Sequence, residues 1–442
     1  MARAMKDSGI PWIGIMPEEW ELHRLKSCIS SRISGAWGNE ATGDVGDTIC
    51  LRIADFDYSR FVFKDTPVEN LTKRNYDQNT INALLLKKGD ILIEKSGGGE
   101  KTPVGRTVIF DKDYPALFAN FMDRIRCSEL VSSKWLQYVF ITFYKNDFSR
   151  NYIKQTTGIQ NLDLTSLLAS ERIPVPTIKE QQHITDYLDF ECARIDAVIE
   201  QTRASIEEYK KLKQSVITQA VTKGIRPGRR MVNSGVDWLG EIPDEWAVFR
   251  IANLYDERNE RGTDDLPILT VSINTGISDH EIPDEEKDRV VVRSEDRTLY
   301  KRVCPGDLAY NMMRAWQGAF GAARVDGMVS PAYVVAKPKM PGILDSRYVE
   351  ALLRTPSAIE EMHRYSRGIT DFRLRLYWPE FKNICVCVPS VKEQIEIADY
   401  IDAKAAEIDT LIQKKQQFLD EMESYKKSLI YEYVTGKKGV KL

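Results

Sequence analysis

The sequence is poor in the residues that build metal sites, disulfide frameworks and membrane spans. It has 4 histidines and 7 cysteines, and it lacks any run of about 18 apolar residues, the length that crosses a bilayer. The histidines form no i, i+4 pair and the cysteines no Cys-x-x-Cys motif, so no metal site is predicted. The odd cysteine count and an N-terminus without the apolar core of a signal peptide predict a reduced, cytoplasmic protein with no membrane partner.

A strong charge of either sign is also absent. The 442 residues include 62 Lys and Arg and 65 Asp and Glu, so the formal net charge of −3 gives no global basic field of the kind that indicates nucleic-acid binding. Hydrophobic residues make up 43% of the chain, which excludes general disorder, and the length predicts about three domains. A basic face confined to one part of a domain remains compatible with DNA.

The chain contains an internal repeat. Residues 8–25 read SGIPWIGIMPEEWELHRL, and residues 234–251 read SGVDWLGEIPDEWAVFRI. A second shared segment begins with Pro-x-x-Lys-Glu-Gln-x-x-Ile at Pro176 and again at Pro389. Between the shared segments lie two regions of different sequence, 26–175 and 252–388. Shared segments around divergent regions indicate one architecture that carries two different recognition surfaces.

Each copy of the second shared segment predicts a long helix. No proline or glycine occurs from Lys179 to Thr222 or from Lys392 to Thr435, and helices of about 44 residues are roughly 66 Å long. Apolar residues recur at alternating spacings of four and three, which favours pairing of the two helices with each other; packing of each helix on its own domain is the alternative. The predicted seam between the helices comprises Leu188, Ile195, Ile199, Ile206, Ile401, Ile408, Ile412 and Leu419.

The divergent regions have the pattern of strand-rich α/β domains. Short β-branched runs predict strands at residues 90–94, 106–110, 268–271 and 332–336, and helices are expected near 134–150 and 346–365. A Gly-Asp pair precedes a strand in each region, and we assign Asp90 and Asp307 a structural role in that turn. Residues 223–230, Lys-Gly-Ile-Arg-Pro-Gly-Arg-Arg, predict a solvated linker, with phosphate contact as the alternative.

Catalytic motifs are not found. Residues 96–102 read Ser-Gly-Gly-Gly-Glu-Lys-Thr, but a P-loop needs glycine directly before the lysine, where Glu100 stands. In residues 283–287 an Asp and a Glu-x-Lys overlap in one acidic segment, whereas a nuclease carries them on separate strands. No methyl-donor loop and no Asn-Pro-Pro-aromatic motif occurs. We therefore expect no catalytic residues in this chain.

The remaining signal is a set of basic and amide side chains among aromatic residues in both divergent regions. Lys and Arg supply affinity for phosphate, and Arg, Gln and Asn can reach base edges. The candidate DNA-binding residues are Lys95, Lys101, Arg106, Lys154, Gln160, Asn161, Arg314, Trp316, Gln317, Arg367, Arg373 and Arg375. Gln160 and Asn161 follow a Gly-Ile pair that is present in both divergent regions. In the second region Thr370-Asp371 stand in place of Gln160-Asn161.

The duplicated order of motifs resembles the specificity subunit of type I restriction–modification systems. It consists of Trp-x-Gly-x-x-Pro-x-x-Trp (Trp12 to Trp20 and Trp238 to Trp246), a variable region, a Gly-Ile turn and the Pro-x-x-Lys-Glu-Gln-x-x-Ile helix start, all present twice. The resemblance implies an α+β fold with two α/β target-recognition domains joined by two long antiparallel helices in a pseudo-twofold repeat. The expected segments are 1–175 (first recognition domain), 176–225 (first helix), 226–388 (linker and second recognition domain) and 389–442 (second helix).

The same resemblance implies a non-catalytic subunit that reads a bipartite, asymmetric target in double-stranded DNA. Two modification (methyltransferase) subunits and the restriction (translocase) subunits are the implied partners. S-adenosylmethionine, ATP and Mg²⁺ are expected on those partners, and no cofactor on this chain. Two alternatives stay open: a coiled-coil scaffold without DNA specificity, and a stand-alone DNA nuclease or methyltransferase.

Overall fold

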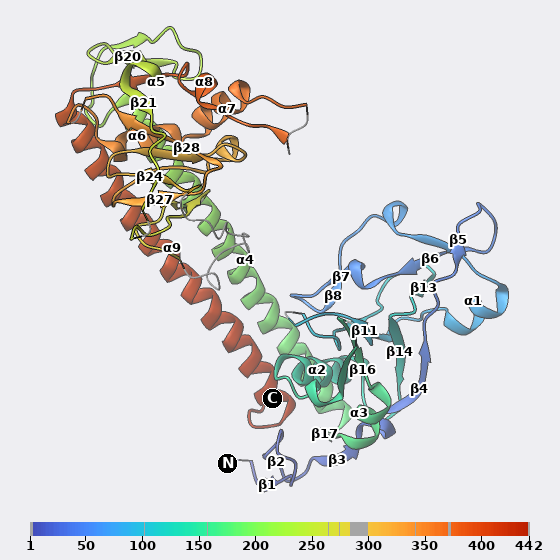
Figure 1. Cartoon of the computed structure of the whole chain (residues 1–442). Helices are drawn as coiled ribbons and strands as arrows, with labels where there is room; N and C mark the ends of the chain where they lie inside the picture. Colours follow the sequence, from blue (N-terminus) through green and yellow to red (C-terminus); the bar gives the residue numbers. More distant parts are fainter. Residues whose placement is uncertain are drawn as a thin grey trace. The chain divides into compact units, whose positions relative to one another are not determined.

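Two long helices, α4 (Ile178–Lys223) and α9 (Val391–Val434), join two units of the chain. Unit 1 comprises Met1–Arg203 and Gln417–Leu442, and unit 2 comprises Ala204–Gln416. The computed structural model (Figure 1) describes residues 3–100, 102–156, 158–263, 265–273, 275–282, 299–340, 342–369 and 373–440. Within these ranges, no helix combines the length and the apolar character that a membrane span requires.

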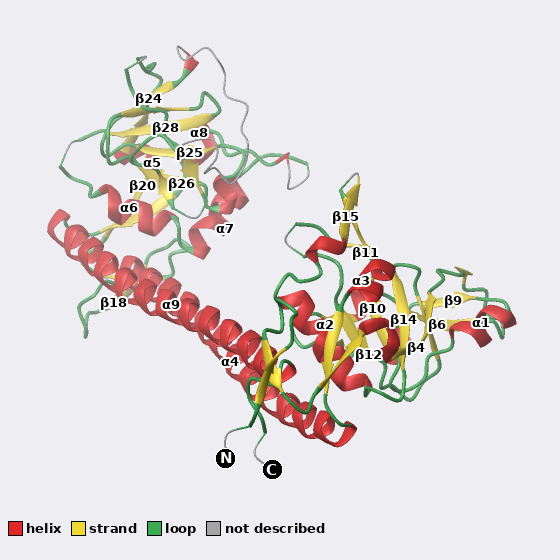
Figure 2. Ribbon diagram, turned by 90° about the horizontal axis from the view of Figure 1, so that it is seen from below, coloured by secondary structure: helices red, strands yellow, loops and turns green. Residues whose placement is uncertain are grey.

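Both predicted helices are confirmed, and so is their pairing with each other. In each unit α4 and α9 lie side by side and antiparallel (Figures 1 and 2). In unit 1 the rings of Tyr187 and Tyr433 lie 4.8 Å apart, and in unit 2 Lys213 donates to Asp409 at 2.6 Å. Seven of the eight residues assigned to the seam are buried, and Ile412 is half-buried.

Beside its parts of the long helices, the described residues of unit 1 form short strands and three short helices. The hairpin β1–β2 opens the unit, and the pairing of β3 with β17 brings the start and the end of the divergent region together. Two four-stranded sheets have the orders β12-β10-β14-β4 and β13-β6-β9-β5, and a smaller sheet has the order β11-β16-β15. The helices are α1 (Gln78–Leu84), α2 (Ser133–Lys145) and α3 (Leu164–Ser170).

The strands of unit 1 are β1 (Met5–Asp7), β2 (Ile15–Pro17), β3 (Glu21–Arg24), β4 (Ile29–Ser34), β5 (Asn39–Glu40), β6 (Asp47–Leu51), β7 (Phe56–Asp57), β8 (Val62–Phe63), β9 (Lys73–Asn75), β10 (Ile91–Glu94), β11 (Ser96–Gly97), β12 (Thr107–Ile109), β13 (Ala116–Phe118), β14 (Met122–Cys127), β15 (Ile153–Thr156), β16 (Ile159–Leu162) and β17 (Arg172–Val175).

Unit 2 repeats the framework of unit 1 around a different domain. The hairpin β18–β19 corresponds to β1–β2, and the pair β20–β29 corresponds to β3–β17. The central sheet has the order β21-β28-β25-β26, and β22–β23 and β24–β27 are separate pairs. The helices are α5 (Ile251–Leu254), α6 (Ser346–Leu353), α7 (Pro356–Tyr365) and α8 (Trp378–Phe381).

The strands of unit 2 are β18 (Met231–Asn233), β19 (Glu241–Pro243), β20 (Ala247–Arg250), β21 (Tyr255–Glu257), β22 (Val271–Ser272), β23 (Gly276–Ile277), β24 (Lys301–Val303), β25 (Leu308–Asn311), β26 (Phe320–Ala322), β27 (Gly327–Val329), β28 (Tyr333–Pro338) and β29 (Cys385–Val388).

The second tryptophan of each opening motif packs against the domain core. Trp20 lies edge-to-face with Trp135 of α2 at 5.6 Å, and Trp246 lies edge-to-face with Tyr348 of α6 at 6.3 Å. Both tryptophans are buried, so the recurrence of this residue in the two motifs has a packing reason.

Three predicted elements differ from the observed ones. The helix predicted near 134–150 ends at Lys145, because Asp147 has a φ of 59° that a helix cannot include. The helix predicted near 346–365 is broken into α6 and α7, because Thr355 caps α7 and Pro356 cannot donate to a preceding turn. The strand predicted at 268–271 is shorter: Val271 begins β22, and Ile268 forms only an isolated bridge with Met328.

The two Gly-Asp turns have the structural role predicted for them. Asp90 accepts a hydrogen bond from the Lys87 N–H at 2.9 Å and pairs with Arg126 at 2.7 Å. Asp307 accepts from the Cys304 N–H at 2.9 Å and pairs with Arg258 at 2.7 Å. Both carboxylates are buried and hydrogen-bonded, as a buried charge must be.

Candidate nucleic-acid interface

A buried glutamine at the start of α4 fixes the domain of unit 1 to the helix pair. The Gln181 side chain donates to the carbonyl oxygens of Leu130 and Pro176, each at 2.9 Å, and accepts from the Ser132 N–H at 2.8 Å. Ser132 is the N-cap of α2, and Gln181 is 0% exposed. One side chain therefore holds the end of the divergent region, the start of α4 and the start of α2 together.

The same arrangement recurs in unit 2. Gln394 at the start of α9 donates to the carbonyl oxygens of Ile343 at 3.2 Å and Pro389 at 2.9 Å. It accepts from the N–H of Asp345, the N-cap of α6, at 2.8 Å. The shared Lys-Glu-Gln motif thus seats two unrelated domains on the helices in the same way.

The glutamate of this motif ties the helix to the opening motif. In unit 1, Glu180 pairs with Arg3 at 2.6 Å and accepts from the indole N–H of Trp20 at 3.1 Å. The Arg3 guanidinium also lies 5.3 Å from the Trp20 ring. Such a cluster of charge, hydrogen bond and ring fixes the direction in which the chain enters the domain.

The corresponding cluster in unit 2 adds two ion pairs to the predicted linker, in which Lys223, Arg226 and Arg230 are exposed. Arg229 is an ion-pair partner of Glu393, and its side chain is 11% exposed. Arg226 of the same segment pairs with Glu396 at 2.5 Å. Because both guanidinium groups are bound by glutamates of α9, the basic segment anchors the chain to this helix. Sequence alone did not indicate this, since the partners lie more than 160 positions away.

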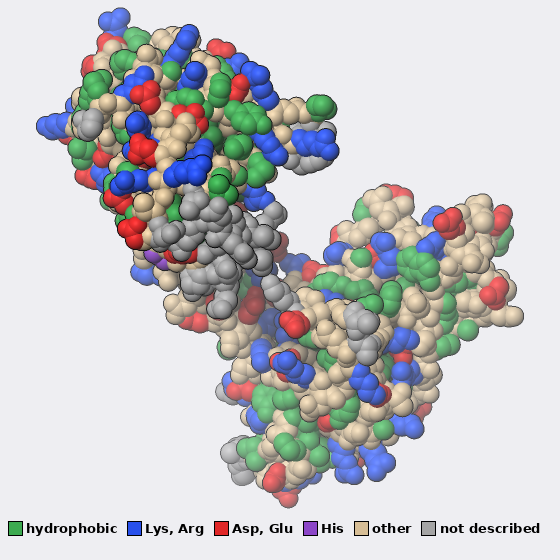
Figure 3. Space-filling view, in the orientation of Figure 1, with side chains coloured by type: hydrophobic (Ala, Val, Ile, Leu, Met, Phe, Trp, Pro, Cys, Tyr) green, Lys and Arg blue, Asp and Glu red, His purple; other side chains and the backbone are tan. Residues whose placement is uncertain are grey.

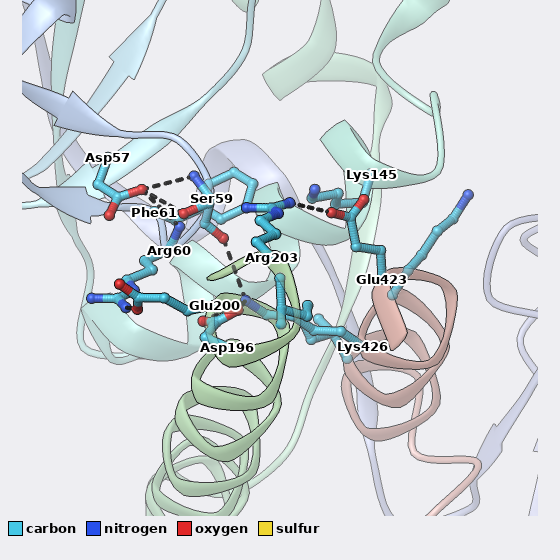
Figure 4. A pocket seen from close by; sticks show the side chains of 13 residues that line it. Asp57, Ser59, Arg60, Phe61, Lys145, Asp196, Glu200, Arg203, Glu423 and Lys426 are labelled. Atoms are coloured by element: carbon cyan, nitrogen blue, oxygen red, sulfur yellow. Dashed lines mark hydrogen bonds and ion pairs between the residues drawn. The ribbon is translucent and has the colours of Figure 1, made fainter. Parts of the chain in front are cut away.

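A cavity of about 450 Å³ lies in unit 1, where the loop between β7 and β8 meets the helix pair (Figure 4). Arg60 of the loop pairs with Glu200 of α4 at 2.6 Å. Lys426 of α9 donates to the Ser59 carbonyl oxygen at 3.3 Å. Figure 4 shows the Arg60 side chain beside Glu200 of α4. Most charges around this cavity are bound to each other, so they fasten the domain to the helices.

Two candidate DNA-binding residues of unit 1 are buried, which contradicts a direct contact with DNA. The Arg106 guanidinium donates to both carboxylate oxygens of Glu94, at 2.6 and 2.7 Å, and lies 3.6 Å from the Tyr58 ring. Its side chain is 7% exposed. Gln160 is also buried and accepts a hydrogen bond from the Val104 N–H at 3.3 Å. Basic and amide residue types alone could not reveal these internal partners.

The sheet β11-β16-β15 carries the accessible candidates of unit 1. Lys154 has a 76% exposed side chain and pairs with Asp163 at 2.9 Å. Its hydrogen bond, together with that from the Ser166 N–H, lowers the pKa of Asp163 to about 2. Asn161 is exposed and accepts from the Ser96 hydroxyl at 2.6 Å. These side chains lie on one face, since Lys154 and Asn161 are direct cross-strand partners.

Two further candidates of unit 1 do not join this group. Lys95 donates to the Ser34 hydroxyl at 2.7 Å and pairs with buried Asp123 at 2.8 Å, so its charge is partly used within the domain. Lys101 lies outside the described residues, as does the acidic segment 283–287.

The candidates of unit 2 fall into two places. Trp316 lies edge-to-face with His363 at 5.6 Å, and its indole donates to the Met313 carbonyl oxygen at 3.0 Å. Arg314 beside it is half-buried, and Gln317 is exposed at the edge of a cavity of about 650 Å³. This cavity is bordered by α6, α4 and α9 within unit 2.

The second place is the loop that follows α7. Arg367 has a 74% exposed side chain and pairs with Glu380 at 2.6 Å, while its backbone pairs with that of Arg375. Arg373 is exposed and Arg375 is half-buried. The backbone pairing therefore brings Arg367 and Arg375 together after α7.

Sequence reasoning missed a cation on the sheet β13-β6-β9-β5 and an aromatic ring just before strand β5. The Arg74 guanidinium of β9 lies 4.2 Å from the ring of Trp37, which is 40% exposed. An exposed tryptophan with an arginine over its face is typical of surfaces that bind nucleic acids. The two residues are far apart in sequence, so only strand pairing reveals their contact.

On one face of each unit, charge is dispersed rather than gathered. On the face drawn in Figure 3, Lys and Arg side chains are interspersed with acidic and hydrophobic side chains in both units. In the part of the chain that the structure describes, no group of three His, Cys, Asp or Glu side chains is placed to hold a metal ion. Local groups such as the sheet β11-β16-β15 of unit 1 are therefore the candidates for a DNA-binding surface.

A family model described as the type I restriction modification DNA specificity domain matches residues 17–208. The chain is 24% identical over 450 residues, 97% of this chain and 96% of the relative, to the protein assigned as the MjaX specificity subunit of a type I restriction enzyme in Methanocaldococcus jannaschii. It is 23% identical over 361 residues to the EcoKI specificity subunit of Escherichia coli, covering 78% of this chain and 74% of that one.

Solved structures show a similar fold. One similar chain comes from structural work on complex assembly and conformational transition of the type I R-M system. It has a TM-score of 0.66 at 13% identity, covering 96% of this chain and 99% of that chain. The HsdS subunit from Thermoanaerobacter tengcongensis has a TM-score of 0.51 at 14% identity, with coverage of 96% and 98%. The similarity in fold extends over both units and both long helices.

Proposed function

Because the chain belongs to the specificity-subunit family of type I restriction–modification systems, we propose that it is the DNA-recognition subunit of such a complex and performs no catalysis itself. The two divergent domains are its readers. The two long helices and the opening motifs form the frame that carries them.

One observation supports this function most strongly: two different domains are seated on one frame by identical contacts. Gln181 and Gln394 make the same three hydrogen bonds, although the domains that they hold have different sheets. The long helices and opening motifs thus hold two unrelated domains in one geometry. This arrangement is expected of a protein whose recognition domains differ in sequence while their attachment to the helices stays the same. Two different readers predict a target with two different halves, so the proposed target is bipartite and asymmetric.

We assign the gap between the two half-sites to α4 and α9, because these helices join the units. They have 46 and 44 residues without an interior proline, so neither contains the residue that commonly kinks a helix. Lengthening both helices by the same number of residues would change the gap and leave the half-sites intact.

The proposed partners are two modification subunits, the restriction subunits and double-stranded DNA. Methyl transfer and DNA translocation need S-adenosylmethionine, ATP and Mg²⁺, and we assign all three to the partner subunits. The contribution of this chain is to place bound DNA relative to those subunits through phosphate contacts that set register and side-chain contacts that read bases.

Co-expression of this chain with the modification subunits of its own system tests the proposal. Adenine methylation is then mapped across the host genome by single-molecule sequencing. The proposal predicts one split, non-palindromic motif that is methylated only when this chain is present. A complex that assembles but methylates no motif would favour the alternative of a coiled-coil scaffold.

A further inference from the structure

Trp37 lies between β4 and β5 with its indole ring in contact with solvent. All eight tryptophans of the chain are within the described residues, and Trp37 is the one that is exposed, at 40%. A single exposed apolar side chain is ordinary on a protein surface. The exposure of Trp37 becomes informative because the surrounding residues hold this ring in place and put a cation over it.

The backbone on both sides of Trp37 is fixed. The Ala36 N–H donates to the Phe118 carbonyl oxygen at 3.1 Å, and the Ala36 carbonyl oxygen accepts from the Tyr76 hydroxyl at 2.9 Å. Gly38 turns the chain with a φ of 69°, and a β-carbon at this position would lie 2.7 Å from the Tyr76 ring. The segment therefore presents the indole from a rigid support, which does not depend on the indole itself.

Arg74 of β9 lies over the exposed ring. Its guanidinium is 4.2 Å from the ring centre of Trp37. Glu40 of β5 is its cross-strand neighbour, yet no carboxylate among the described residues, that of Glu40 included, forms an ion pair with Arg74. The Nε atom of Arg74 is enclosed without a hydrogen-bond partner, whereas its terminal amino groups are not enclosed. The guanidinium therefore has a fixed plane, an unneutralised charge and two amino groups that face solvent.

This part of unit 1 is remote from its long helices. The strands β5, β6 and β9 lie at the end of the unit that is turned away from α4 (Figures 1 and 2). The contacts that attach the domain to α4, through Gln181 and Arg60, are therefore separate from the Trp37–Arg74 pair. Attachment to the helices does not explain the pair, and its open donor groups point to an acceptor outside the protein.

We infer that Arg74, oriented by Trp37, donates to O6 and N7 of a guanine in the major groove of the first half-site. A bidentate contact to these two atoms is the commonest specific contact between a basic side chain and DNA. A phosphate contact needs only a positive charge, whereas a guanidinium of fixed plane suits two acceptors on one base edge. Trp37 is then a positioning residue. The inference rests on the proposed DNA-recognition function and assigns one base contact to it.

The test uses the full chain in complex with its modification subunits and compares two cation variants of β9. Arg74→Met removes the proposed donors and is expected to lower the preference for guanine at one position of the first half-site by about tenfold. The second half-site and the gap stay unchanged. Lys73→Met removes the same charge from the neighbouring position, on the opposite face of the strand, and should leave every position of the motif as in the wild type.

Two variants of Trp37 test its positioning role. Trp37→Phe keeps an aromatic face beneath the guanidinium and should keep the wild-type motif. Trp37→Ala removes that face and should relax the same position as Arg74→Met. A Trp37→Ala complex that keeps its preference for guanine at that position overturns the positioning role. Thermal unfolding of all these complexes should be alike, as expected for accessible side chains.

A second measurement identifies the atoms contacted. Once the motif is mapped, a duplex with 7-deazaguanine at the assigned position lacks the N7 acceptor. It is expected to bind the wild-type complex about tenfold more weakly than the guanine duplex and to bind the Arg74→Met complex equally well. Equal binding of both duplexes by the wild type overturns the inference, as does a first half-site without any G·C pair.

The two proposals fail in different ways. If the wild-type complex methylates no split motif, the DNA-recognition function is wrong and this inference with it. If Arg74→Met methylates the wild-type motif, recognition stands and the guanine contact is wrong. A uniform loss of affinity in Arg74→Met, with the salt dependence of binding reduced by about one phosphate contact, would show that Arg74 binds the backbone and would also overturn the guanine contact.

Discussion

Lys426 of α9 donates to both carboxylate oxygens of Asp196 of α4, at 2.6 and 2.7 Å, beside the buried seam residues Ile195 and Ile199. The residues 213 positions away, Lys213 and Asp409, form the same bridge at 2.8 and 2.6 Å with the helices exchanged. A polar pair in an apolar seam fixes the register of two helices. The repeat therefore preserves the register of the two helices as well as the glutamine contacts that attach each domain to them.

The two bridges differ in exposure, and we expect their contributions to stability to differ accordingly. The side chains of Lys426 and Asp196 are 13% and 17% exposed, whereas those of Lys213 and Asp409 are 31% and 56% exposed. Lys426→Met leaves the largely buried carboxylate of Asp196 without its ion-pair partner and should lower the free energy of unfolding by about 2 kcal/mol. Lys213→Met should lower it by about 0.5 kcal/mol or less.

Urea unfolding of both variants, followed by the helical circular dichroism signal, checks this difference. Equal effects of the two substitutions would show that burial does not set the contribution of the bridge.

The Glu94–Arg106 pair predicts a pH-dependent cost of substitution. Burial raises the pKa of Glu94, and the hydrogen bonds and charge of Arg106 oppose that rise. Arg106→Met removes the opposition, so the carboxyl pKa rises further in the folded state. The variant therefore keeps its stability at low pH, where Glu94 is protonated in the folded and the unfolded state. It loses stability as the pH rises above 4.5, the ordinary pKa of a glutamate.

We expect Arg106→Met to destabilise unit 1 by about 3 kcal/mol at pH 8 and by clearly less at pH 5. Combining it with Glu94→Gln should recover most of the loss at pH 8. Denaturant titrations of the wild type, the single variant and the double variant at both pH values measure this. A loss that is the same at pH 5 and pH 8 would mean that the carboxylate charge is not the cause.

The hydrogen bonds by which Gln181 and Gln394 attach the two domains to the long helices are expected to contribute strongly to the free energy of unfolding. Gln181→Ala removes three hydrogen bonds and leaves the Ser132 N–H and two carbonyl groups without their partner, at a cost of about 3 kcal/mol. Gln182→Ala is the matched control, since the Gln182 side chain is exposed and donates to Asp186 one turn further along α4. It should change the unfolding free energy by about 0.5 kcal/mol or less. Similar melting temperatures for both variants would contradict the assigned role of Gln181.

A buried thiol predicts a loss of stability in alkali. Burial raises the pKa of Cys387 from 9.0 to about 12, against an opposing hydrogen bond from Tyr348. The folded state therefore binds a proton that the unfolded state releases, and this stabilisation is present below pH 9 and disappears as the pH rises to 12. Between pH 9 and pH 12 the free energy of unfolding of Cys387→Ala should fall by about 3 kcal/mol less than that of the wild type. Parallel stability curves of the two proteins in this range would refute the prediction.

The features that depend on local order were predictable from the sequence. The long helices follow from the missing proline and glycine, and the Asp90 and Asp307 turns follow from a Gly-Asp pair before a strand. The partners of charged residues were not predictable, because they are set by strand pairing and helix packing. Arg106 meets Glu94 on a neighbouring strand, and Arg229 meets a glutamate of the distant helix α9.

Exchange of one reader is the most direct test of the central claim that two independent domains share one frame. Residues 26–175 are replaced by the corresponding region of a related specificity subunit whose target has a different first half. The chimaera is expressed with the modification subunits, and adenine methylation is mapped genome-wide. The account predicts a motif in which one half is new while the other half and the gap are unchanged. A motif altered in both halves, or not altered at all, would contradict it.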